Sequence, residues 1–178
     1  MAAVSRSRRG IAGIVFIIAG ALLALAIVLP LLGVSVSLGW LAALAYAGIA
    51  VAFAILGFGA VNSTLAKVTL IVAAIGWALL AIATVVPGLP ALLILIAAVI
   101  AAVGGLIGAI VLYVGKEIRN TPALVFIATT VLGLLYLLPR IATTVSFGSL
   151  GTVIAVLFAA GLIITGVLFY QKETGRRG

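Results

Sequence analysis

The chain has 178 residues, of which 67% are apolar and only 7% are charged, and it contains no cysteine and no histidine. A soluble globular domain carries about 25% charged residues, so the composition excludes such a domain and predicts an integral membrane protein. Without imidazole or thiol groups, the usual catalytic bases, thiolate nucleophiles, disulfides and zinc, haem or iron–sulfur ligands are excluded as well.

Charged residues divide the chain into uncharged stretches that are long enough to cross a membrane. Two helical spans of about 20 residues fit between Arg9 and Lys67, and two more fit between Lys67 and Lys116. One span fits on each side of Arg140. We therefore predict an all-α membrane protein with six transmembrane helices, over 11–32, 38–60, 65–86, 90–114, 122–139 and 148–170. The whole chain, 1–178, forms one membrane domain with short basic tails over 1–10 and 171–178.

The distribution of basic residues predicts the orientation. If the N-terminus is cytoplasmic, every Lys and Arg except Arg140 lies on the cytoplasmic side, as the positive-inside rule requires. An even number of spans places both termini there. The formal charge of +8 then reflects contact with anionic lipid headgroups, at about 1 kcal/mol per basic residue. Nucleic-acid binding is excluded as a partner class, because the basic residues are spread over several loops without interleaved aromatic residues.

Three of the predicted helices end in an apolar residue followed by proline, at Pro30, Pro87 and Pro139. Proline cannot continue the hydrogen-bond ladder, so we expect each to end its span where the lipid ends. A short turn, a second helix rich in Ala and Gly, and a basic segment follow each time. This pattern predicts three tandem parallel helical hairpins, with repeats over 11–62, 65–115 and 121–171. In the third repeat, Asn120 is the expected cap and Pro122 the first helical residue.

Small residues predict where the helices approach one another most closely. Gly13 and Gly20 form such a face on the first span, and Gly104, Gly105 and Gly108 form another on the fourth. Packing within the chain is the first interpretation of these faces, and an oligomer interface is the alternative.

Aromatic residues divide into two predicted groups. Those at the span ends are expected to form an interfacial belt: Trp40, Tyr113, Tyr136 and Tyr170. Tyr46 and Trp77 lie deeper, where we expect burial and a hydrogen bond to a neighbouring helix.

The hydrophobic spans carry no ionisable residue near their predicted centres, which argues against ion-coupled transport. The two glutamates are far apart in the sequence and form no pair of neighbouring carboxylates, so we predict no catalytic, cofactor-binding or metal-binding residue and no enzymatic activity.

Arg140 is the only predicted outer charge; it is expected either to snorkel to the interface or to contact a lipid headgroup or a partner. Lys116 and Arg119 are further candidates for lipid or partner contact, in a basic loop whose Glu117 is expected to make only an incidental ion pair.

The first span has the pattern G-I-x-F-I-x-x-G-x-x-L-A-L, followed by proline at the helix end and by a second helix rich in Gly and Ala. In this respect the chain resembles the HdeD family of short-repeat, six-helix bacterial inner-membrane proteins. The matching stretches are 13–30 with 39–57, 69–87 with 92–113 and, more loosely, 124–139 with 151–170. The resemblance implies a non-enzymatic protein of the bacterial cytoplasmic membrane that is linked to acid resistance, without catalytic residues or cofactors.

Three functions follow as hypotheses. The first is an HdeD-like role in envelope or acid stress or in membrane permeability. The second is an accessory subunit of a larger membrane complex, and the third is a passive channel for a small neutral solute, lined by hydroxyl and carbonyl groups.

Overall fold

A computed structural model describes residues 2–34, 39–118, 120–142 and 144–174, with side chains from Arg8 to Gln171. Six α-helices account for nearly all of these residues, and no strand occurs among them. Each helix is long and apolar enough to cross a membrane, which confirms the prediction of an all-helical protein with six candidate spans. The helices are α1 (Ala2–Leu31), α2 (Gly39–Gly59), α3 (Thr64–Val85), α4 (Ala91–Val114), α5 (Asn120–Ile141) and α6 (Ser149–Thr174).

Pro30 and Pro139 lie in the last turns of their helices and do not stop the helix at the proline itself. Both lie inside a helix, which continues to Leu31 in α1 and to Ile141 in α5. A proline lacks only its own N–H donor, and the residues beyond it still find acceptors: the Ala142 N–H donates to the Leu138 carbonyl at 2.8 Å. Pro87 lies beyond α3, whose C-cap is Val86.

Three other helix ends differ from their predicted positions by two residues or more. Helix α1 begins at Ala2, so most of the predicted N-terminal tail is helical. Asn120 and Pro122 are the first and third residues of α5, and a proline in the first turn has no intrahelical hydrogen bond to lose. Helix α6 continues to Thr174, and 175–178 lie outside the described residues.

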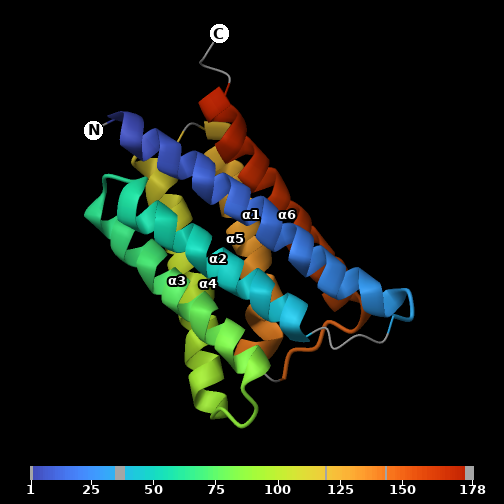
Figure 1. Ribbon diagram of the computed structural model, residues 1–178. Helices are drawn as coiled ribbons and strands as arrows, with labels where there is room; N and C mark the ends of the chain where they lie inside the picture. The colour runs from blue at the N-terminus through green and yellow to red at the C-terminus, as the bar shows by residue number, and fades with distance from the viewer. Residues whose placement is uncertain (1, 35–38, 119, 143, 175–178) are drawn as a thin grey trace.

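The six helices form a closed ring. Each packs against its neighbours in the sequence, and α1 closes the ring against α6 (Figure 1). Helix α2 packs against α3 as extensively as against α1, so the packing does not single out three hairpins as separate units. The start of α1 and the last turn of α6 lie at the same end of the bundle (Figure 1), which we call the terminal end. The opposite end, where α1, α3 and α5 finish, is the distal end.

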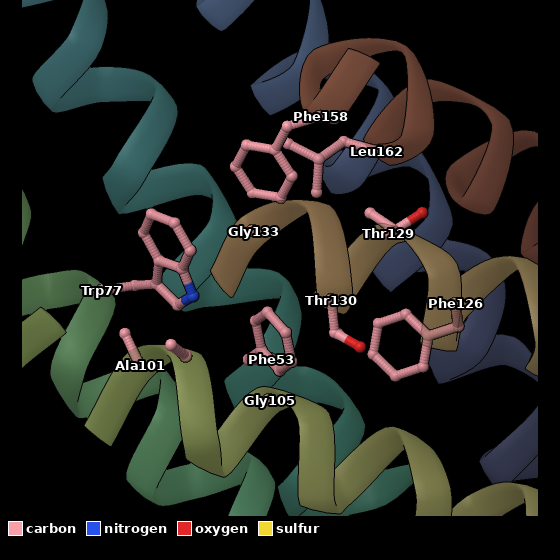
Figure 2. Close-up of a pocket in the computed structure, with 11 residues that line it drawn as sticks. Phe53, Trp77, Ala101, Gly105, Phe126, Thr129, Thr130, Gly133, Phe158 and Leu162 are labelled. Carbon is pink, nitrogen blue, oxygen red and sulfur yellow. The ribbon is translucent and has the colours of Figure 1, made fainter. Parts of the chain in front are cut away.

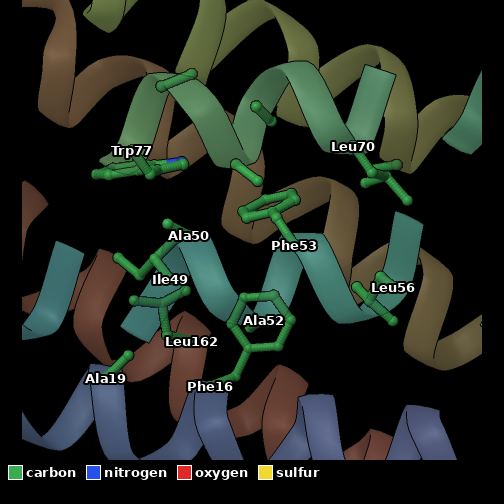
Figure 3. Close-up of a cluster of buried hydrophobic side chains, with 14 of the residues drawn as sticks. Phe16, Ala19, Ile49, Ala50, Ala52, Phe53, Leu56, Leu70, Trp77 and Leu162 are labelled. Carbon is green, nitrogen blue, oxygen red and sulfur yellow. The ribbon is translucent and has the colours of Figure 1, made fainter. Parts of the chain in front are cut away.

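Aromatic side chains fill the half of the ring nearer the terminal end. Phe16 from α1, Phe53 from α2, Phe126 from α5 and Phe169 from α6 form a phenylalanine cluster with ring centroids 5.6–6.3 Å apart. Figure 3 shows Phe16 and Phe53 among the buried side chains of α1, α2 and α6. Edge-to-face and tilted pairs at these distances are favourable for aromatic rings.

Glycines permit the closest helix contacts. At Gly13 of α1, an added Cβ would lie 2.6 Å from the Gly166 carbonyl oxygen of α6, and at Gly20 it would lie 2.8 Å from the Ala159 carbonyl oxygen. Such distances leave no space for a side chain, so the backbones of α1 and α6 are in direct contact.

Helix α4 uses its glycines in the same way toward two sides of the ring. An added Cβ at Gly104 would lie 2.9 Å from the Thr69 carbonyl oxygen, and one at Gly108 would lie 2.7 Å from a methyl carbon of Leu70. Both therefore face α3. Gly105 faces the ring interior, where an added Cβ would lie 3.3 Å from the Phe53 ring. All five glycines predicted from the sequence lie at intrachain helix contacts.

Candidate functional site

Side chains of the described residues line a small void at the centre of the ring. Rings from α2, α3, α5 and α6 surround it: Phe53, Trp77, Phe126 and Phe158 (Figure 2). The void measures about 10 Å³, which is at the lower limit for one water molecule. Helix α5 passes the rings closely at Gly133, where an added Cβ would lie 3.0 Å from Phe158. Side chains from four helices thus pack around a void too small for more than about one water molecule.

Three buried threonines contribute hydroxyl groups to this interior. The Thr129 hydroxyl donates to the Val125 carbonyl at 2.8 Å, and that of Thr130 donates to the Ile127 carbonyl at the same distance. Thr165 of α6 pairs instead with Thr129 of α5, at 2.9 Å between hydroxyl oxygens. Among the described residues, no buried side-chain nitrogen or oxygen lacks a hydrogen-bond partner. These hydroxyls need no ligand to satisfy them.

A second aromatic group, the stacked cluster, lies on the distal side of the phenylalanine cluster. Tyr136 of α5 and Trp77 of α3 both stack on Phe158 of α6, with centroids 5.4 and 5.8 Å away. Tyr46 of α2 packs against both Trp77 and Tyr136. Its hydroxyl oxygen lies 2.5 Å from that of Tyr136. This hydrogen bond across the ring confirms the expectation for Tyr46.

Among the predicted belt residues, Tyr136 is half-buried, and its hydroxyl bonds to Tyr46. The other three belt residues are exposed, Trp40 by 63%, Tyr170 by 43% and Tyr113 by 38%. Trp77 is buried as expected, but it makes ring contacts where we expected a hydrogen bond.

At the terminal end of the bundle, two charged side chains form hydrogen bonds with backbone groups of neighbouring segments. The Glu117 carboxylate, in the turn after α4, accepts hydrogen bonds from the backbone N–H groups of Asn62 and Ser63, both at 2.7 Å. Ser63 is the N-cap of α3, so the negative charge lies at a helix N-terminus, where the helix dipole favours it. Arg9 of α1 donates to the carbonyl oxygens of Ala60 at 2.8 Å and of Glu117 at 2.9 Å. The expectation of an incidental ion pair at Glu117 is thus wrong, since its carboxylate binds backbone donors.

The two other basic residues predicted in this loop have different outcomes. Lys116 is exposed and has a positive φ of 50°, which a turn of this tightness requires. Arg119 lies outside the described residues.

At the distal end, an open groove of about 640 Å³ runs between the end of α3, the start of α4 and the end of α5. Its walls are mainly apolar, and Arg140 is the only charged residue among them. The Arg140 guanidinium carbon lies 5.4 Å from the centre of the Tyr46 ring, in a cation–π contact. The candidate site therefore combines an apolar groove with one cation that a buried tyrosine positions.

Sequence reasoning identified Arg140 as a candidate but missed the groove, the Tyr46–Tyr136 bond and the Glu117 network. Glu117 carried the one available signal, since it is one of only two acidic residues in the chain. The N–H donors that it binds belong to a turn more than fifty positions away in the sequence, so no local pattern reveals the contact.

In the described part of the chain, no three His, Cys, Asp or Glu side chains lie together in a way that could hold a metal ion. The chain matches no protein-family model, no curated protein and no solved structure.

Proposed function

We propose that this chain is a non-enzymatic, HdeD-like protein of a bacterial cytoplasmic membrane, which acts in the envelope or acid stress response by preserving the permeability barrier. The filled interior carries the proposal. Aromatic rings from four helices leave a void of about 10 Å³ at the centre of the ring. A bundle of this kind adds protein to the membrane without adding an aqueous path, since water and ions need a continuous polar route.

The proposal includes an orientation. Both termini are cytoplasmic, the chain repeats as three parallel hairpins, and the terminal end faces anionic headgroups of the inner leaflet. Arg8, Arg9, Lys67 and Lys116 belong to this end, whereas Arg140 belongs to the other. This asymmetry supports the orientation by the positive-inside rule. Reporter fusions at the C-terminus and in the turn at Gly88 test it, because only the second is expected to be exported.

The function is tested in the host bacterium by deleting the gene and measuring survival at low pH together with leakage of a membrane-impermeant dye. We expect lower survival and faster leakage, both restored by the intact chain. A complementing copy with Gly166→Leu, which separates α1 from α6, is expected not to restore them. Unchanged survival and leakage after deletion would contradict the proposal.

Two further measurements separate the alternatives. Flux of small neutral solutes into liposomes that contain the pure protein is expected to equal flux into empty liposomes, and faster flux would favour a passive channel. Purification in mild detergent, followed by mass spectrometry, is expected to give the protein alone or as a homo-oligomer. A constant set of other subunits would favour an accessory role in a larger complex.

A further inference from the structure

The distal end contains a cation for which the protein supplies no anion. The chain has only two acidic residues: Glu117 bonds to backbone groups at the terminal end, and Glu173 belongs to the last turn of α6 at that same end. Among the described residues, the Arg140 side chain has no hydrogen bond and no ion pair, and its guanidinium makes a cation–π contact with Tyr46. An anion that pairs with this guanidinium must therefore come from outside the chain.

The groove beside Arg140 is shaped for an apolar chain. On α3 it runs from Leu80 to Thr84, and on α4 from Ala91 to Leu95, which is about 6 Å of helix on each side. Its volume of about 640 Å³ lies within the range of small-molecule binding sites, about 300–1,000 Å³. The groove is open, and Leu92 at its rim is 66% exposed, on a surface that faces lipid when the helices span a membrane.

Together these features match one kind of molecule already present in the membrane. Arg140 lies in the last turn of α5, where the span ends and phospholipid phosphates lie. The apolar walls extend from there toward the membrane interior. We propose that this groove binds an acidic phospholipid of the distal leaflet, with its phosphate at Arg140 and the upper part of an acyl chain between α3, α4 and α5.

Arg140 is held in place for this contact. Its guanidinium lies over the Tyr46 ring, and the Tyr46 hydroxyl is bonded to Tyr136 on the same helix as Arg140. A planar guanidinium can bind two phosphate oxygens at once, and pre-organisation lowers the entropy lost on binding. Tyr46 is thus a positioning residue, which orients the cation without contacting the lipid.

The absence of cysteine allows a direct test with the full chain in vesicles of equal phosphatidylglycerol and phosphatidylcholine. A single cysteine at Leu92→Cys, in the groove, carries a fluorophore, and one lipid at a time is brominated to quench it. Leu150→Cys is the matched control. It is also the second residue of a helix that starts at the distal end, and it is 62% exposed compared with 66% for Leu92. We expect phosphatidylglycerol to be enriched about fivefold near Leu92→Cys and not near Leu150→Cys.

Variants of charged residues then test whether Arg140 causes the enrichment of phosphatidylglycerol. Arg140→Gln is expected to abolish it at Leu92→Cys, and Arg140→Lys is expected to retain part of it, because the charge remains but the fork of donors is lost. Lys116→Gln removes the same net charge at the terminal end and is expected to leave the enrichment unchanged. Equal enrichment at both labelled positions would overturn the proposal, and so would enrichment that persists in Arg140→Gln. The comparison between the two labelled positions needs no change at Arg140, so it decides the question even if that variant fails to fold.

Discussion

The two ends of the bundle satisfy their charged groups in opposite ways. At the terminal end, the Glu117 carboxylate and the Arg9 guanidinium bond to backbone atoms and join α1, the α2–α3 turn and the α4–α5 turn. At the distal end, the Arg140 guanidinium lies over an aromatic face and has no hydrogen bond or ion pair among the described residues. The first arrangement stabilises the fold, because each charge gains partners that water would otherwise supply. In the second arrangement, the Arg140 guanidinium keeps its hydrogen-bond donors available for a molecule outside the chain.

The helices also pack more closely at the terminal end than at the distal end. Near the terminal end, Gly13 and Gly166 bring α1 and α6 into backbone contact. At the distal end, an open groove separates parts of α3, α4 and α5. We infer that the terminal end holds the ring closed and that the distal end is where the protein meets other molecules.

The largest expected effect comes from one substitution made at both ends of α6. Gly166→Ala places a methyl group against the Gly13 carbonyl oxygen and Ile17, and we expect it to lower the free energy of unfolding by about 3 kcal/mol. Gly151→Ala meets only Phe147, at 3.7 Å, and is expected to raise stability by about 0.5–1 kcal/mol because alanine favours helix. Unfolding in detergent, followed by circular dichroism, measures both. Equal effects would show that the two ends are packed equally tightly.

The next effect concerns the carboxylate at the terminal end. Glu117→Ala leaves the N–H groups of Asn62 and Ser63 without their acceptors, and we expect a loss of about 2 kcal/mol, as for hydrogen bonds to charged groups. Hydrogen exchange at these two amides is expected to accelerate. Lys116→Ala, on the exposed neighbouring side chain, is the control and should change stability by less than about 0.5 kcal/mol. A Glu117→Ala variant with wild-type stability would contradict this role for the carboxylate.

The hydrogen bond of the stacked cluster is expected to contribute less. Tyr46→Phe and Tyr136→Phe each remove one partner of the 2.5 Å hydroxyl pair. In a double-mutant cycle we expect a coupling energy of about 0.6 kcal/mol, as for other hydrogen bonds between membrane helices. The double variant should be less destabilised than the sum of the single variants, because each single variant leaves a lone hydroxyl and the double variant leaves none. Strict additivity would argue that the two hydroxyls do not interact.

The smallest effect on stability is expected at the cation of the distal end. Arg140→Gln removes an exposed guanidinium whose described contact is with the Tyr46 ring, so in neutral detergent we expect a loss of about 0.5 kcal/mol. Arg9→Gln, at the terminal end, removes hydrogen bonds to two carbonyl oxygens and is expected to cost more. If Arg140→Gln were the more destabilising of the two, the distal cation would be part of the fold rather than a group available for binding.

Hydropathy and the spacing of charges are sufficient to predict the six helices and most of their ends to within one or two residues. A lipid environment imposes this, because each span must satisfy its backbone hydrogen bonds internally and must be about 20 apolar residues long. The prolines show the limit of local reasoning. Pro30 and Pro139 lack a donor but lie so near a helix end that the next residues still find acceptors, and the helices continue past them.

The contacts between helices depend on the closed ring. Glycine spacing indicates that a close approach exists, yet only the tertiary structure pairs Gly13 with Gly166 and Gly104 with Thr69. The same holds for Tyr46 with Tyr136 and for Glu117 with the α2–α3 turn. The physical reason is that apolar residues cover both the lipid-facing and the inward-facing surfaces of these helices, so hydropathy does not distinguish one side from the other. Which faces meet, and hence where the groove and its single cation lie, is decided by the packing of all six helices together.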